Sequence, residues 1–238
     1  MKCKNADLPD GGLTFPELLV VVAILGLITC VALPLLAANQ SRSEQAVCFN
    51  NLRQTGRAIH LWGNDHADRT PWFTPVLEGG TRNTGNALRN NAYFQMGGMS
   101  NELNTPAILI CPSDLTRKMA SNFSADTSGG FFSPGFRDAS LSYLIGLHSI
   151  FDAPESILSG DRNIHWDSVN NSCSLGVLAT ALLYPNASAF WTSAIHSERG
   201  NLLFTDGRVD QVSNKGLQKA LSDSRQGANG SDHFMPPN

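Results

Sequence analysis

The feature that most constrains this chain is a run of 24 uncharged, mostly aliphatic residues from Leu18 to Ser41. About 20 such residues are enough for a helix to cross the hydrocarbon core of a bilayer. One acid, Glu17, stands directly before the run, and the head of the chain, Met1–Gly12, carries Lys2 and Lys4 and ends in two glycines. A carboxylate at the edge of an apolar span is costly unless a cation pairs with it. The run therefore predicts a membrane-embedded helix whose first turn holds an acid that needs a partner.

A basic head, a glycine and an apolar run with an acid near its start closely resemble the leader of type IV pilins and type II secretion pseudopilins. In that family a membrane peptidase cuts after the glycine and methylates the new amino terminus. The resemblance implies a cut between Gly12 and Leu13, which makes Glu17 the fifth residue of the mature chain. There it would neutralise the α-amine of a neighbouring subunit and set the stagger between subunits. Pro34 stands where many pilins have a helix-kinking proline, whereas Leu13 replaces the usual phenylalanine.

The same resemblance implies the partners and the location of the protein. The partners would be the prepilin peptidase, other pilin or pseudopilin subunits and the bacterial inner membrane. Lys2 and Lys4 place the amino terminus in the cytoplasm by the positive-inside rule, so the rest of the chain after a single span lies in the periplasm or outside the cell. The implied function is that of a structural subunit of a type IV pilus-like or type II secretion filament.

Two other interpretations of the N-terminal segment stay open. It could be an ordinary secretory signal cleaved near Leu36-Ala37-Ala38, or a lipoprotein signal ending at Cys30. Either would make the chain a secreted or anchored binding module, for example for polysaccharide. Neither explains the pairing of Gly12 with Glu17, so we prefer the prepilin interpretation. The stretch Thr14–Glu17 also fits a helix-capping box, a role that can coexist with assembly.

Length and composition limit what the rest of the chain does. The 238 residues leave about one soluble domain after the head and the span are subtracted. A net charge of −3 provides no basic surface for nucleic acid, and 21 glycines with 12 prolines indicate a loop-rich domain. The sequence has no Gly-x-Ser-x-Gly, phosphate-loop or His-Glu-x-x-His motif, so an enzyme is not expected.

An amphipathic helix is predicted to continue directly from the apolar run. Between residues 43 and 64 an apolar stripe recurs at spacings of four, seven and three residues: Cys48, Leu52, Ile59 and Trp62. We therefore expect one helix from about Phe15 to Asn64, roughly 75 Å long at 1.5 Å per residue. The expected parts are a leader (1–12), a transmembrane segment (13–38), an amphipathic continuation (39–66) and a head (67–238). The resemblance implies an α+β fold with this helix packed on an antiparallel sheet.

Several short elements are predicted in the head. Apolar segments favour strands at 107–111, 141–150, 156–161 and 163–167, whereas 175–184 fits either a strand or a helix. Residues 76–106 are interpreted as mainly loop with a short helix at 88–93, residues 217–221 as a helix, and 222–238 as a polar tail. Asp206-Gly207 between 201–205 and 208–212 is a strong hairpin signal, because both turn positions would take φ > 0.

His196, nine further residues and then Asp206-Gly207 resemble the end of a pilin-like group, the prepilin-associated H-X9-DG domain, here at 196–213. Weaker likeness lies at 50–66, 111–114 and 159–162. We expect Asp206 to serve the turn and His196 to hydrogen-bond a loop. The alternative is a calcium site, because pseudopilins can hold calcium in late loops. Calcium takes six to eight oxygens, and three scattered acids (Glu198, Asp206 and Asp210) are too few, so no cofactor is predicted.

The chain has five cysteines. Cys3 leaves with the leader and Cys30 lies in the span, which places Cys48, Cys111 and Cys173 in an oxidising compartment. Spacing alone does not choose a pair among three. The related family often has one cysteine before Asn-Leu-Arg-Gln and another before Pro-Ser, which implies a Cys48–Cys111 disulfide. Cys173 is then a buried thiol or an intermolecular link. Without a Cys-x-x-Cys pattern, a zinc site is not expected.

Overall fold

The structure, a computed structural model, describes residues 14–82, 90–166, 173, 181–183, 188–224 and 232–237. The predicted cleavage residues Gly12 and Leu13 lie outside these ranges. The chain divides into two compact units, Met1–Ser43 and Glu44–Asn238, which are considered separately below.

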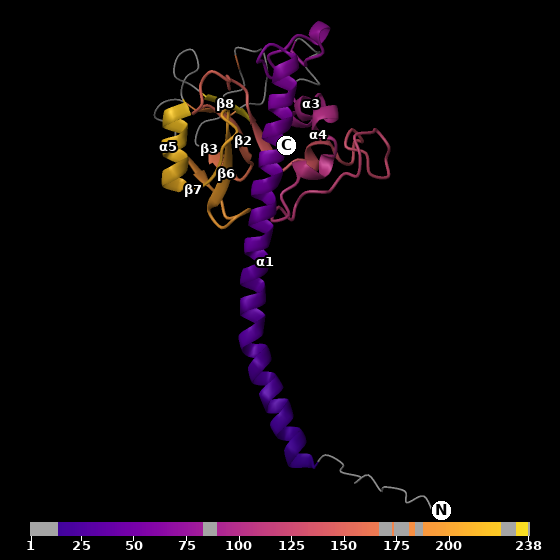
Figure 1. The fold of residues 1–238 in the computed structure, drawn as a ribbon, viewed down its shortest axis with the longest axis vertical. Helices are drawn as coiled ribbons and strands as arrows, with labels where there is room; N and C mark the ends of the chain where they lie inside the picture. Colours follow the sequence, from indigo (N-terminus) through magenta and orange to yellow (C-terminus); the bar gives the residue numbers. More distant parts are fainter. Residues whose placement is uncertain are drawn as a thin grey trace, which may run out of the picture. The chain divides into compact units, whose positions relative to one another are not determined.

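The long N-terminal helix is present as α1, Phe15–Asp65, the indigo-to-purple helix of Figure 1. Pro34 lies within α1 and does not end it. In the first unit, Phe15–Leu33 has a mean hydropathy of 2.5 and no part of it is buried. By length and composition this helix can cross a membrane, although a signal sequence has the same properties. The Thr29 hydroxyl donates to carbonyl oxygens of the preceding turn, which satisfies this polar group inside the helix.

The second unit is built on a six-stranded antiparallel sheet with the order β4-β8-β1-β2-β6-β7, accompanied by a two-stranded sheet of β3 and β5. The strands are β1 (Tyr143–Gly146), β2 (Ile157–Asp161), β3 (Ile164–Trp166), β4 (Ala181–Leu183), β5 (Ala189–Trp191), β6 (Arg199–Phe204), β7 (Val209–Ser213) and β8 (Asp232–Met235). The shorter helices are α3 (Ala92–Gly97), α4 (Ser100–Leu103) and α5 (Asn214–Ser224), with 3-10 turns η1 (Val76–Glu78), η2 (Pro106–Leu109) and η3 (Arg137–Ser140). The predicted α+β class with an antiparallel sheet is confirmed.

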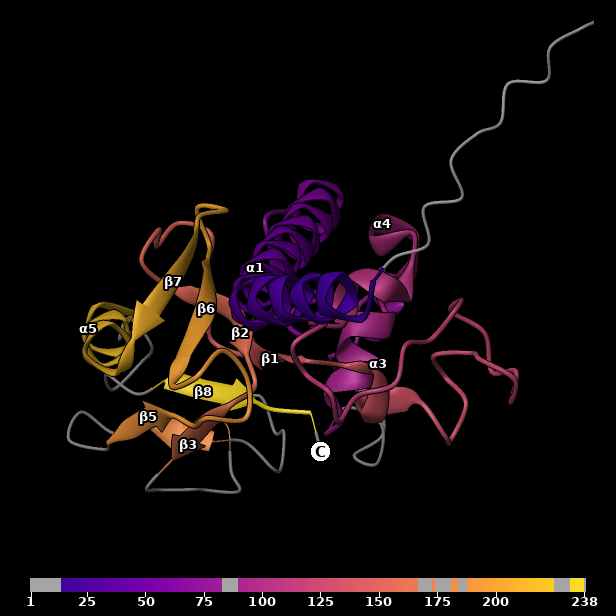
Figure 2. The same ribbon diagram turned by 90° about the horizontal axis from the view of Figure 1, so that it is seen from below.

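Two apolar cores cover the two faces of the six-stranded sheet. Successive strand residues alternate between them, because side chains on a strand point to opposite faces. In β6, Leu203 packs in the core that contains Leu52 and Ile59 of α1, whereas Leu202 and Phe204 pack in the core that contains α5 and β5. Figures 1 and 2 show the sheet between the Glu44–Asp65 part of α1 and the pair β3–β5, with α5 beside β7. The apolar stripe on α1 is thus a core stripe, as predicted.

The predicted strand at 107–111 is wrong. Residues Pro106–Leu109 form the 3-10 turn η2, and Ile110 directly after it is extended. Thr105 caps the turn, since its hydroxyl accepts a hydrogen bond from the amide of Ala107 at 3.3 Å. Pro106 occupies the first position of the turn, where its missing N–H costs nothing.

The predicted polar tail at 222–238 is wrong in its second half. Strand β8 lies inside the sheet between β4 and β1, and pairs Gly146 with Phe234 and Leu182 with His233. The apolar run in this segment is too short to predict a strand from the sequence alone. The segment forms a strand because it pairs with two neighbouring strands. The short helix expected at 88–93 is found at 92–97, and of the undecided segment 175–184 the described part, 181–183, is a strand.

The hairpin of β6 and β7 is confirmed, with Leu203 opposite Val209. Its turn differs from the expectation. Gly207 has φ 83°, whereas Asp206 is not in the left-handed region. The amide of Gly207 donates to the carbonyl of Phe204 at 3.0 Å, and Arg208 follows before the strands pair again. One glycine with positive φ is therefore enough for this longer loop.

Candidate functional site

The first candidate site is the start of α1. The amide and the hydroxyl of Thr14 both donate to one carboxylate oxygen of Glu17, Oε2, at 2.8 and 2.7 Å. Glu17 thus reaches back to the residue before the helix, as the acid of a capping box does. Both side chains are exposed, and no described residue donates to the second oxygen, Oε1. The carboxylate can therefore cap its own helix and still accept a bond from another molecule.

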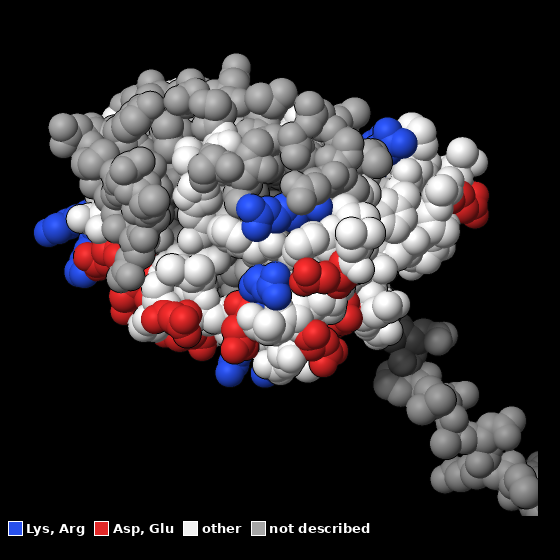
Figure 3. Space-filling model, turned by 90° about the horizontal axis from the view of Figure 1, so that it is seen from above, with Lys and Arg blue, Asp and Glu red and all other residues white. Residues whose placement is uncertain are grey.

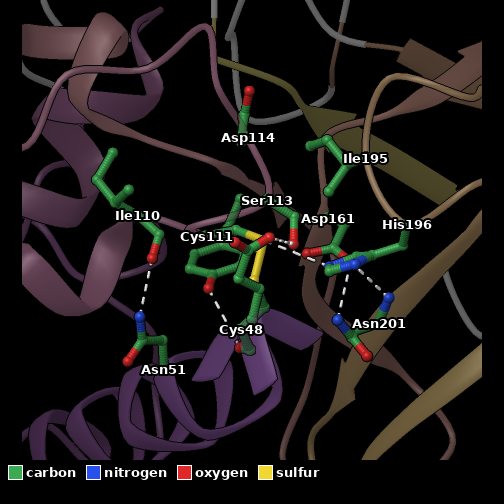
Figure 4. The surroundings of a disulfide bond; sticks show 12 residues. Cys48, Asn51, Ile110, Cys111, Ser113, Asp114, Asp161, Ile195, His196 and Asn201 are labelled. Carbon is green, nitrogen blue, oxygen red and sulfur yellow. Dashed lines mark hydrogen bonds and ion pairs between the residues drawn. A yellow bond between two sulfur atoms is a disulfide. The ribbon is translucent and has the colours of Figure 1, made fainter. Parts of the chain in front are cut away.

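The second candidate site surrounds a Cys48–Cys111 disulfide, which is the pairing that the family resemblance implies. Cys48 lies on α1 and Cys111 follows η2, so the bond ties the helix to the loop region of the head (Figure 4). Two hydrogen bonds reinforce it. The Asn51 side chain donates to the carbonyl of Ile110 at 2.8 Å, and the Tyr143 hydroxyl donates to the carbonyl of Cys48 at 3.2 Å.

Two buried ionisable side chains stand against this disulfide. His196 Nε2 is 3.3 Å from Cys111 Sγ and 3.5 Å from Asp161 Oδ2 (Figure 4). The backbone and side-chain amides of Asn201 donate to that same Asp161 oxygen at 2.7 and 3.0 Å. The opposite atoms, Asp161 Oδ1 and His196 Nδ1, are buried and have no hydrogen-bond partner among the described residues.

Burial decides the charge of both groups. Loss of solvent raises the pKa of Asp161 to about 7; the charge of Asp114 adds to the increase, and the bonds from Asn201 oppose it. Burial also lowers the pKa of His196, against the attraction of Asp114 and Glu44. The neutral form of the pair is therefore favoured. Both side chains are buried, and His196 packs against the disulfide.

A segment of unusual backbone places His196. Three consecutive residues, His196, Ser197 and Glu198, have φ of 56°, 51° and 62°. This region is uncommon for any residue but glycine. The left-handed turn leads into β6, where Asn201 meets Asp161.

The structure separates the residues of the predicted H-X9-DG signature. Asp206 is exposed in the hairpin turn, where its carboxylate accepts the amide of Arg208 at 2.8 Å, whereas His196 is buried beside the disulfide. Asp210 also contacts Arg208, whose guanidinium binds Glu155 at 2.8 Å as well. These carboxylates are thus occupied by one arginine. Asp206 serves the turn, as expected, whereas His196 contacts Asp161 and Cys111.

Sequence analysis missed Asp161, Asn201 and Tyr143 as members of this centre. The only signal was the weak family likeness at 159–162, which contains Asp161 but assigns it no partner.

On the surface, Lys and Arg are interspersed with Asp and Glu over the described part of the face in Figure 3, in line with the small net charge.

Comparisons of the chain with protein-family models, with curated proteins and with solved structures give no match.

Proposed function

We propose that this chain is a membrane-anchored structural subunit of a bacterial filament, without a catalytic role. The observation that carries the proposal is the helix Phe15–Leu33, which has no buried residue in the single chain and whose only charged residue is Glu17 in its first turn. So large an apolar surface is unstable in water and needs lipid or the apolar helices of other subunits. A plain membrane anchor would use the acid for the helix cap alone.

Within this class, we propose a type IV pilin-like or type II secretion pseudopilin subunit. Cleavage after Gly12 would free the α-amine of Leu13. In a filament, Glu17 of one subunit would pair with that amine on its neighbour, using the carboxylate oxygen that the cap leaves open. The pair is favoured where water is excluded, because the Coulomb attraction grows as the dielectric constant falls.

The Cys48–Cys111 disulfide supports the orientation in this proposal. Disulfides persist in the periplasm and outside the cell and are rare in the cytoplasm. The bond and the contacts of Asn51 and Tyr143 fasten the Glu44–Asp65 part of α1 to the head. A filament subunit whose helix is held by its neighbours needs such a joint, because force on the head is passed to the helix.

The test separates the assembly role of Glu17 from its capping role. Glu17→Val removes the carboxylate, whereas the matched control Thr14→Val removes the capping hydroxyl and leaves the carboxylate in place. We expect Glu17→Val to be processed and inserted into the membrane but lost from sheared or purified filaments, and Thr14→Val to assemble. Assembly of Glu17→Val at the level of the unaltered chain would reduce Glu17 to a helix cap and would contradict the proposal.

A further inference from the structure

A second group of metal-ligating side chains lies away from the disulfide. His148 follows β1 by two residues, His233 lies in β8, and Cys173 comes from the segment between β3 and β4. His148 Nε2 is 3.1 Å from Cys173 Sγ, and His233 Nδ1 is 3.0 Å from His148 Nε2. The three ligand atoms lie within 4.8 Å of one another.

The fold holds two of these residues together by backbone pairing. Strands β1 and β8 are neighbours in the sheet, and the amide of Leu147 donates to the carbonyl of His233 at 2.8 Å. The two imidazole rings meet at an interplanar angle of 75° with their centroids 4.3 Å apart. Rings that stack face to face cannot direct nitrogens at one centre, whereas this edge-on arrangement can.

We propose that His148, Cys173 and His233 form a binding site for one Zn²⁺ ion. The choice of zinc follows from the chemistry of the three donor atoms. Thiolate and imidazole are ligands of zinc and of other borderline or soft transition metals, whereas calcium and magnesium take oxygen. Zinc needs four ligands, so the fourth position belongs to water or to another group of the protein.

The spacing of the ligand atoms fits a zinc ion. Bonds of about 2.0–2.1 Å to nitrogen and about 2.3 Å to sulfur at tetrahedral angles separate two nitrogens by about 3.4 Å and nitrogen from sulfur by about 3.6 Å. The separations of 3.0 and 3.1 Å are slightly shorter, so the side chains need to move apart by about half an ångström to admit the ion.

Burial of the group is a second geometric observation. Cys173 and His233 are buried and His148 is half-buried, so the donors are already largely withdrawn from water.

The disulfide centre offers a contrast. The ligand atoms of Cys48, Cys111 and His196 also lie within 4.8 Å of one another, but both sulfurs are bonded to each other in the disulfide. Cys173 is the buried cysteine that keeps a thiol, and two histidines accompany it.

The test uses the full chain without a histidine tag, in detergent micelles, stripped of metal with a chelator and then titrated with Co²⁺ as a spectroscopic probe. We expect one Co²⁺ per chain with a thiolate-to-cobalt charge-transfer absorption that added Zn²⁺ abolishes. Cys173→Ser and His233→Ala should each weaken binding at least about 100-fold, beyond the 10–100-fold typical for loss of an outer-shell partner. The matched controls Cys30→Ser and His165→Ala, which alter an exposed cysteine and an exposed histidine, should bind as the unaltered chain does.

A charge-transfer band that survives Cys173→Ser, or no band in the unaltered chain, would overturn the site and leave a thiol hydrogen-bonded to histidine. X-ray absorption on the unaltered zinc-loaded chain gives an answer even if the variants fail to fold. One sulfur and two imidazole nitrogens in the first shell support the site, and a shell of oxygen and nitrogen alone refutes it.

Discussion

Asp161 carries the clearest electrostatic consequence of the fold at the scale of single residues. Its carboxyl group is fully buried between His196 and Asn201. Its pKa is about 7 in the folded protein, whereas the ordinary value is 3.8. Between these two values the unfolded chain has lost the proton that the folded chain keeps. Each increase in pH across that window therefore favours unfolding.

We predict that Asp161→Asn flattens this dependence. Relative to the variant, the unaltered chain should lose stability as the pH rises from about 4 to about 7, by up to about 1.4 kcal/mol per pH unit. Thermal unfolding followed by circular dichroism at a series of pH values measures the difference. Asp206→Asn is the matched control, because it removes an exposed carboxyl group from a turn, and the slope that Asp161 causes should survive it. Parallel profiles for Asp161→Asn and the unaltered chain would contradict the raised pKa.

The disulfide is the second residue-scale feature. Cys48 and Cys111 are 63 residues apart, for which the chain-entropy model gives roughly 4 kcal/mol, reduced by any strain. We predict that the double variant Cys48→Ala/Cys111→Ala lowers the unfolding free energy by about 2–4 kcal/mol in guanidinium chloride titrations. Cys30→Ala, which removes an exposed thiol, serves as the control and should have little effect. An unchanged denaturation midpoint in the double variant is the result that this account does not allow.

Among the secondary-structure elements, β8 is the one that joins the edge strand β4 to the rest of the six-stranded sheet. Phe234 is 2% exposed and stacks on Trp166 with the ring centroids 5.4 Å apart. Its neighbour Met235 faces the opposite core. This strand therefore contributes to both cores although it comes near the end of the chain.

We predict that Phe234→Ala destabilises the head by about 3–5 kcal/mol, because it removes a buried aromatic ring and leaves a cavity. Leu77→Ala is the matched control, since Leu77 is 100% exposed and its truncation should change stability by less than about 0.5 kcal/mol. Chemical denaturation of the two variants gives the comparison. Equal effects would mean that β8 does not lie inside the sheet.

The elements that sequence analysis predicted correctly are those whose signal is local. The apolar run and the stripe that follows define α1, and Asp206-Gly207 between two apolar segments defines the hairpin of β6 and β7. The missed strand β8 depends on contacts that are distant in sequence, because it exists through its pairing with β4 and β1. The error at 107–111 has a local cause: Thr105 caps the turn and Pro106 begins it, and these signals outweigh the apolar residues that favoured a strand.

The candidate sites show the same division. Thr14 and Glu17 are three residues apart, so a motif of a single helical turn predicts their contact. Asp161 and His196 meet only through the sheet and through a left-handed turn that contains no glycine, so no local pattern predicts their contact. Likewise His148 and His233 are 85 residues apart, with Cys173 between them in sequence, so no local pattern such as Cys-x-x-Cys predicts that the three side chains meet.

For the whole molecule, the central claim is that the N-terminal apolar helix is an assembly element and not a signal that is removed. The two outcomes leave different mature proteins. A prepilin keeps the whole of α1 and begins at Leu13, whereas cleavage near Ala38 or lipidation at Cys30 discards most of the exposed apolar segment.

The most direct measurement is mass spectrometry of the amino terminus of the mature protein, isolated from the membrane of a bacterium that produces it together with a prepilin peptidase. The account predicts an N-terminal peptide that begins at Leu13 with a methylated α-amine and still contains Glu17. Loss of the peptidase should leave the chain uncut and unmethylated. A mature chain that begins at Asn39, or one that begins with a lipid-modified Cys30, would contradict the account.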